Sequence, residues 1–332
     1  MDKKAEIIFI NVGYGESIIV RSGSKTLLID GGSNEADEYV GKSGRTRAVD
    51  FLRSEGISHL DAVIVTHVHE DHLCGLLPVI QEIDVEKIFL PFPLVKAPGK
   101  ICMKQPLKEN LQKSLAALND FLQLNSVVSP DKFIDVGFEY IQLGDILVRN
   151  ITGLNPNCPD IYKAINILAA SSAEDEKMTC LKSIDAGMNN CSLVLQLDIF
   201  GQKVLLPGDS NAERLESLLE RSPDILKADI FKIGHHGQAD SITTRLIDAI
   251  EPELVICSAS NDGRYGSYNV LLRDELSKRD ISFIRTDPDL SFEKARRGIS
   301  LMFSEHSREV MMRCIDQDFF EGKVRCAALG AE

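Results

Sequence analysis

Three histidines and one aspartate stand within six consecutive positions, residues 67–72 of the 332-residue sequence. His67 and His69 are two positions apart and can point the same way in an extended turn, whereas Asp71 and His72 turn toward an adjacent position. Imidazole nitrogens and carboxylate oxygens are common ligands of zinc and manganese, and two such ions about 3.5–4 Å apart can share a water and lower its pKa. The spacing therefore predicts a hydrolytic centre with two divalent metal ions.

Three further motifs place polar side chains after short apolar runs. Asp209 follows Leu-Leu-Pro-Gly and could bridge both ions, and Asp30 follows Leu-Leu-Ile and could orient a ligand histidine. His235 and His236 stand between glycines, where either could bind metal or protonate a leaving group, and the sequence leaves that choice open. Each motif alone is also typical of an ordinary turn, so the prediction depends on all of them meeting at one place.

These motifs fall where strands are expected to end. Apolar runs bounded by turn-forming residues predict strands, and the longer periodic runs between them predict helices. The strands are expected at residues 6–10, 17–21, 25–30, 61–66, 140–143, 146–151, 193–199, 203–206, 230–233, 254–258, 282–285, 299–303 and 309–314, and the helices at 45–54, 73–83, 107–124, 211–220, 241–250 and 268–278. Two strand-rich halves, each flanked by helices, predict an α/β fold with two mixed sheets packed face to face and helices outside, an αββα sandwich.

The sequence predicts a single domain over residues 1–314, because no linker rich in Gly, Ser or Pro divides it. An insertion at about residues 92–185 has the least regular pattern, and such insertions often select the substrate. Residues 315–332 are expected to form a C-terminal tail.

Composition limits the partners and the compartment. The formal net charge of −13 disfavours long nucleic acids, although a short or single-stranded substrate in a metal-lined cleft is compatible with it. No apolar run approaches the roughly 20 residues that span a bilayer and the first residues show no export signal, so we expect a cytoplasmic protein without membrane contact. The eight cysteines form no Cys-x-x-Cys motif and are expected to be reduced thiols. The oligomeric state stays open.

In this order along the chain, the four motifs resemble the metallo-β-lactamase superfamily, and more narrowly the metallo-β-lactamase-like domain of ComEC-type competence proteins. The resemblance covers roughly residues 5–304 without the insertion, and the residues that carry it are 11–17 (Asn-Val-Gly-Tyr-Gly-Glu-Ser), 67–72, 189–197, 206–209, 235–237 and 261–272. It implies that His67 and His69 serve the first metal site, that Asp71 and His72 serve the second, and that Asp209 bridges them. His236 is a further candidate ligand.

Two departures from the superfamily pattern affect the metal sites. The usual histidine ahead of the Gly-Ser strand would fall near residues 188–190, where Asn189 and Asn190 stand instead as poor substitutes. The first site then lacks one imidazole, so the metal is expected to be manganese or weakly held zinc, with one ion bound more tightly than the other. A late histidine found in many members is also absent near residues 258–261.

The leading hypothesis is a metal-dependent hydrolase that uses a metal-bound hydroxide on a phosphodiester, like a nuclease or phosphodiesterase. Asp71 would orient the hydroxide and His235 or His236 would protonate the leaving oxygen. The first alternative is a hydrolase of a small carboxylic ester, lactone or thioester, which needs the same metal chemistry and an apolar pocket. The second is a non-catalytic metal-binding or interaction protein that has kept the fold.

Overall fold

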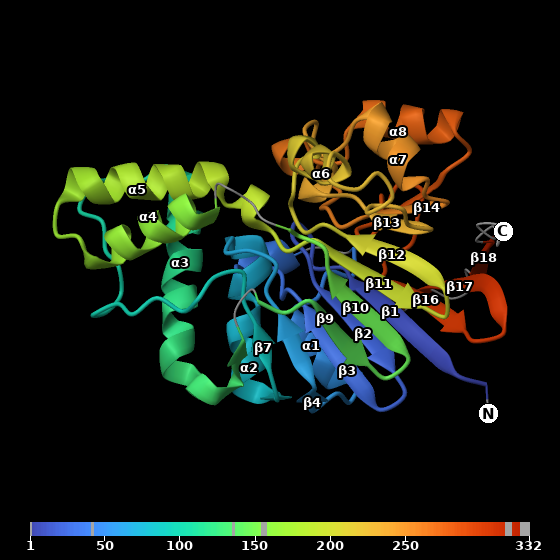
Figure 1. Ribbon diagram of the computed structural model, residues 1–332, viewed down its shortest axis with the longest axis horizontal. Helices are drawn as coiled ribbons and strands as arrows, with labels where there is room; N and C mark the ends of the chain where they lie inside the picture. The colour runs from blue at the N-terminus through green and yellow to red at the C-terminus, as the bar shows by residue number, and fades with distance from the viewer. Residues whose placement is uncertain (1, 41–42, 135–136, 154–157, 316–320, 326–332) are drawn as a thin grey trace.

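Two β-sheets lie against each other in the structure, a computed structural model that describes residues 2–40, 43–134, 137–153, 158–315 and 321–325 (Figure 1). The strands of the first sheet, in spatial order, are β18 (Glu321–Arg325), β17 (Ser307–Ile315), β16 (Gly298–Ser304), β1 (Lys4–Ile10), β2 (Ile18–Ser22), β3 (Lys25–Ile29), β5 (Ala62–Ile64), β7 (Ile88–Phe89) and β8 (Phe133–Ile134). Those of the second are β15 (Ser282–Arg285), β14 (Leu254–Cys257), β13 (Ile230–Lys232), β12 (Gln202–Leu206), β11 (Leu195–Ile199), β10 (Ile146–Asn150) and β9 (Tyr140–Leu143). A short pair, β4 (His59–Leu60) and β6 (Asp84–Val85), lies apart.

Helices cover the outer face of each sheet. The α-helices are α1 (Ala48–Ser54), α2 (Leu76–Glu82), α3 (Glu109–Val127), α4 (Cys158–Ala170), α5 (Glu174–Gly187), α6 (Ala212–Leu219), α7 (Thr244–Ile250) and α8 (Val270–Lys278). Single turns are η1 (Ala36–Tyr39), η2 (Glu70–Cys74), η3 (Pro130–Lys132), η4 (Asn189–Cys191), η5 (His235–Gly237) and η6 (Arg264–Gly266). No helix among the described residues has the length and apolar character needed to cross a membrane.

Strand β1 shows how each sheet comes to be buried on both faces. Successive side chains of a strand point to opposite faces, and here Ile7 belongs to the apolar cluster between the two sheets. Its neighbour Ile8 belongs to the cluster that joins the first sheet to α1 through α5. On the other side, Phe231 of β13 packs with α6, α7 and α8. The αββα sandwich predicted from the sequence is confirmed.

The loops that carry the candidate metal ligands all follow strands with a parallel neighbour. β3 pairs in parallel with β5, and β12 pairs in parallel with β13, which pairs in parallel with β14. Parallel strands end at the same edge of a sheet, and this edge of an open α/β sheet is a common place for ligands to bind. The loops that begin after Ile29, Ile64, Leu206 and Lys232 meet at this edge of the sandwich, where His72 Nε2 lies 3.3 Å from His236 Nε2.

The region assigned to the insertion differs from its expected form in one respect. The last part of this region, for which the sequence predicted no helix, forms two helices, α4 and α5, which pack with α3 beside the first sheet (Figure 1). The spacing of Ile161, Ala164, Ile165 and Leu168, all buried, is that of an amphipathic helix. Beyond residue 315, part of the expected tail is the strand β18, which pairs with β17. Residues 316–320 and 326–332 lie outside the described residues.

Candidate metal centre

Four side chains from three loops converge on one buried point. Asp71, His72, Asp209 and His236 each offer a ligand atom, and these atoms lie within 4.8 Å of one another. The Nε2 atom of His236 lies 3.0 Å from Asp71 Oδ2 and 3.1 Å from Asp209 Oδ2. The Nε2 atom of His72 lies 3.3 Å from Asp209 Oδ1. Two imidazoles and two carboxylates so arranged form a donor set suited to zinc or manganese.

The turn η2 turns Asp71 and His72 toward this point. It packs closely against the end of β3, where the Gly31 amide donates to the His72 carbonyl at 2.7 Å. A Cβ on Gly75 would lie 2.0 Å from the Gly31 carbonyl oxygen, so only glycine allows this approach. The backbone contact fixes His72 beside the carboxylate that follows β3.

The adjacent histidines His235 and His236 point in different directions. Both have positive φ, 43° and 52°, which reverses the chain sharply after β13. His236 is fully buried, and its Nδ1 donates to the Ser258 carbonyl at 2.6 Å, so its Nε2 faces the cluster. His235 lines the adjoining cavity, and its Nδ1 lies 2.8 Å from Asp240 Oδ1. The structure thus places His236 in the cluster and His235 beside it.

His67 and His69 form a second, less complete donor group. His67 Nε2 lies 3.2 Å from His69 Nδ1 and 4.0 Å from Asp209 Oδ2. Asp209 therefore stands between this pair and the first cluster, as expected of a bridging carboxylate. The group has two imidazoles and one shared carboxylate, which is a smaller set than the four donors around His236.

The two asparagines expected to replace a histidine behave differently. Asn190 accepts from the Asn211 amide at 3.2 Å, at the start of α6. Asn189 places its Nδ2 2.9 Å from His235 Nε2, and its Oδ1 is buried without a hydrogen-bond partner. Of the two, Asn189 is the one that offers a free oxygen at the cavity.

Asp30 supports the cluster from behind. Its carboxylate accepts from the Thr66 amide at 2.8 Å and from the Thr66 hydroxyl at 2.6 Å, and it lies 2.7 Å from His72 Nδ1. A carboxylate behind a ligand histidine fixes the ring orientation and its protonated nitrogen. The structure thus places Asp30 behind His72, and its role in orienting a metal ligand stays a prediction.

We expect Asp30→Asn to weaken divalent metal binding about 10–100-fold, because losing the carboxylate partner of a ligand histidine typically costs that much. The measurement is a zinc titration against a chromophoric chelator. Asp84→Asn is a matched control, since Asp84 Oδ2 lies 2.9 Å from Nδ1 of the exposed His59, far from the cluster. Equal affinities in the two variants would contradict the role given to Asp30.

The buried charges of the cluster fit a bound cation. Burial lowers the pKa of His236, but the carboxylates of Asp209 and Asp71 outweigh burial and raise it to about 9. Burial raises the pKa of Asp209, yet the neighbouring imidazoles hold it well below its usual range. Burial and the nearby His72 hold the pKa of His67 well below its usual range, so His67 stays neutral with a free lone pair. Positive charge nearby stabilises the buried carboxylates, and bound metal ions would supply that charge in place of the protons on the histidines.

Several residues at the centre were not among the predicted site residues. The ring of Tyr14 lies 4.5 Å from that of His236, and its hydroxyl accepts from Gln238 Nε2 at 3.0 Å. Beneath Asp209, Lys232 and Glu16 form an ion pair in which both side chains are fully buried. A lysine inside an otherwise apolar strand was the available signal for this pair.

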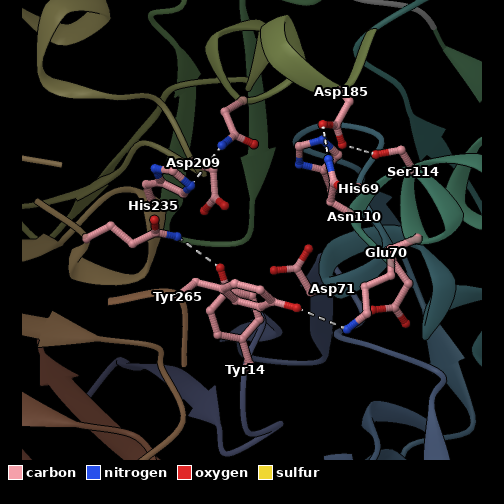
Figure 2. A pocket seen from close by; sticks show the side chains of 13 residues that line it. Tyr14, His69, Glu70, Asp71, Asn110, Ser114, Asp185, Asp209, His235 and Tyr265 are labelled. Carbon is pink, nitrogen blue, oxygen red and sulfur yellow. Dashed lines mark hydrogen bonds between the residues drawn. The ribbon is translucent and has the colours of Figure 1, made fainter. Parts of the chain in front are cut away.

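A cavity of about 250 Å³ opens beside the cluster and gives it access to solvent (Figure 2). Asp71, Asp209, His69 and His235 face it from the two halves of the sandwich. Helices α3 and α5 supply part of the wall, namely Asn110, Lys113, Ser114 and Asp185. The expected insertion therefore contributes to the pocket.

The sequence matches the family described as the metallo-beta-lactamase superfamily over residues 10–89. It is 25% identical to ComE operon protein 3 of Bacillus subtilis over 300 residues, 86% of this chain and 32% of that protein. It is 21% identical to competence protein ComA of Neisseria gonorrhoeae, over 90% of this chain and 33% of that protein. The chain thus spans about one third of the length of these curated relatives. The resemblance to this superfamily and to ComEC-type proteins is confirmed.

Solved structures with related arrangements include the metallo-beta-lactamase fold protein YhfI from Bacillus subtilis. That structure is 13% identical, with a TM-score of 0.48 over 90% of this chain and 100% of that chain. Another is a diphosphatase of the PhnP family, which is 13% identical with a TM-score of 0.44 over 92% of this chain and 99% of that chain.

Proposed function

We propose that this protein is a metal-dependent hydrolase and that its substrate is a small or short phosphodiester. The observation that carries the proposal is the convergence of Asp71, His72, Asp209 and His236 beside an open cavity, whose wall includes Asp71 and Asp209. A structural role alone does not explain buried carboxylates and imidazoles that face one another beside a cavity, because buried charges are costly unless they bind or pair.

Two metal sites follow from the donor groups. His67, His69 and Asp209 would hold the first ion, with the free Oδ1 of Asn189 as a further oxygen nearby. The second ion would be held by the donor set Asp71, His72, Asp209 and His236. Divalent zinc or manganese bound there supplies Lewis acidity, which neutralises phosphate charge and lowers the pKa of water.

His235 is the better placed of the two adjacent histidines for proton transfer. His236 is enclosed by the carboxylates of Asp71 and Asp209, which suits a ligand. His235 lines the cavity with its Nδ1 held by Asp240 and its Nε2 2.9 Å from Asn189 Nδ2, so it would exchange a proton with a leaving oxygen once the substrate displaces the Asn189 amide from Nε2. Asp71 lies between the cavity and His236 and would orient the attacking water.

The charges of the cavity wall favour a substrate with little charge of its own. Lys113 is the lysine that lines it, and its Nζ lies 3.3 Å from Glu35 and 3.4 Å from the Tyr265 hydroxyl. Together with the net charge of −13, this wall suits a single phosphodiester group rather than a long polyanion. The cytoplasmic location stays a prediction, and the oligomeric state stays open.

The test compares two chromogenic substrates on protein stripped by chelation and then loaded with zinc or manganese. We expect hydrolysis of bis-p-nitrophenyl phosphate in the loaded protein, and a loss of at least about 100-fold after metal removal, because several kcal/mol of charge stabilisation disappear with the ions. Elemental analysis of the loaded protein should give two ions per chain. Preferential cleavage of p-nitrophenyl acetate would favour the ester hydrolase instead, and no turnover of either would favour a non-catalytic protein.

A further inference from the structure

One nitrogen of His69 is buried without a partner. His69 Nδ1 faces His67 Nε2 at 3.2 Å, so this nitrogen lies on the side of the first metal site. Its Nε2 is buried and has no hydrogen-bond partner. A histidine that binds metal through one nitrogen normally donates the other N–H to a carboxylate or carbonyl oxygen. An unpartnered buried N–H costs free energy, so a partner is expected near Nε2.

The carboxylate of Asp185 lies beside His69 at the wall of the cavity (Figure 2). Burial lowers the pKa of His69, and the carboxylates of Asp71 and Asp209, and to a smaller extent that of Asp185, act against that shift. Asp185 is held in place by α3: Asn110 Nδ2 donates to its Oδ2 at 2.7 Å, and the Ser114 hydroxyl donates to its Oδ1. Two donors on one helix thus fix a carboxylate on another.

Each carboxylate oxygen can accept more than one hydrogen bond, so these two contacts leave Asp185 able to accept a third. The cluster contains a precedent, since Asp30 is held by Thr66 and also lies 2.7 Å from Nδ1 of His72. Asp30 follows a core strand, whereas Asp185 stands near the end of α5 in the expected insertion.

We propose that Asp185 is a positioning residue for the first metal site and accepts the Nε2–H of His69, directly or through one water. The inference rests on the metal sites of the proposed function. It gives helices α3 and α5 a specific task, which is to stabilise the metal site that has the fewer ligands. Asp185 compensates there for the absent imidazole by increasing the basicity and fixing the orientation of His69.

The experiment measures zinc binding rather than hydrolysis. Wild-type protein, Asp185→Asn and Ser114→Ala are titrated with Zn²⁺ against a chromophoric chelator. We expect Asp185→Asn to weaken binding of the lower-affinity zinc ion about 10–100-fold and to leave the affinity for the other ion unchanged. Ser114→Ala should weaken the same binding step to a smaller extent. Asp175→Asn, at an exposed carboxylate in the first turn of the same helix, is the matched control and should bind as wild type does.

A second readout separates positioning from a structural role. In zinc-loaded wild type, the imidazole ¹H–¹⁵N spectrum should show a His69 Nε2–H protected from solvent exchange, and Asp185→Asn should lose that protection while its metal-free melting temperature stays close to wild type. An Asp185→Asn variant that binds both ions with wild-type affinities would overturn the inference, as would a wild-type protein that binds a single ion. A protein that binds two ions but cleaves no phosphodiester would instead overturn the proposed function and leave this inference standing.

Discussion

Asp209→Asn is expected to lower kcat/KM for bis-p-nitrophenyl phosphate at least about 10³-fold, equivalent to about 4 kcal/mol of transition-state stabilisation. The reason is its position. One carboxylate lies 3.3 Å from His72 Nε2, 3.1 Å from His236 Nε2 and 4.0 Å from His67 Nε2, so it belongs to both donor groups. Asparagine keeps the size of the side chain but cannot bridge two cations as an anion. Steady-state kinetics and elemental analysis on the same preparation measure the effect.

The metal content decides how this loss is interpreted. We expect Asp209→Asn to retain fewer ions per chain than wild type after dialysis. Asp224→Asn is the control, because Asp224 is an exposed aspartate that pairs with Lys227 at 3.4 Å. Wild-type turnover in Asp209→Asn would show that the reaction occurs elsewhere on the molecule.

The fold could be predicted from the sequence because its strands carry a strong local signal. The run Leu254–Cys257, for example, is apolar throughout and fully buried, as expected for a strand buried on both faces. The predicted strands at residues 140–143 and 146–151 are β9 and β10, which join the second sheet rather than the helical region near them in sequence. Strand pairing is a long-range property, so periodicity locates a strand without giving its neighbours.

The positions of the candidate ligands were also predictable, because strand ends bring them together. Asp30, Asp209 and His236 each follow a strand within a few residues, and parallel pairing places those ends at one edge. The direction in which each histidine points was not predictable. The positive φ of His235 and His236 and the hydrogen bond to the Ser258 carbonyl separate the two rings, and neither feature has a signal in the dipeptide.

Two parts of the centre depend on contacts between distant segments and were therefore missed. The apolar residues of α4 have the spacing of an amphipathic helix. Helix α5 buries few apolar residues, so its apolar periodicity in the sequence is weak. Asp185 gains its role only through Asn110 and Ser114 on α3. Likewise, nothing near Lys232 in the sequence identifies Glu16 as its partner.

The pair formed by Glu16 and Lys232 also has consequences for stability. Both side chains are fully buried, and the Lys232 ammonium also lies 3.2 Å from the Gly208 carbonyl and 3.8 Å from Asp209 Oδ1. Burial raises the pKa of Glu16, whereas the charge of Lys232 opposes that rise. The pKa of Glu16 is nevertheless raised overall, so Lys232 favours the charged carboxylate without fully offsetting burial, and its ammonium places a positive charge below the bridging aspartate.

Lys232→Met is expected to destabilise the metal-free protein by about 3–5 kcal/mol, because removing one partner of a buried ion pair leaves the other charge uncompensated. The free energy of unfolding is measured by urea denaturation. Lys227→Met, which removes a surface pair with Asp224, should cost less than about 1 kcal/mol. Adding Glu16→Gln to Lys232→Met should recover most of the loss, since the unpaired charge is then gone. If the two substitutions instead add without any recovery, the two side chains are energetically independent and Lys232 has some other role beneath Asp209.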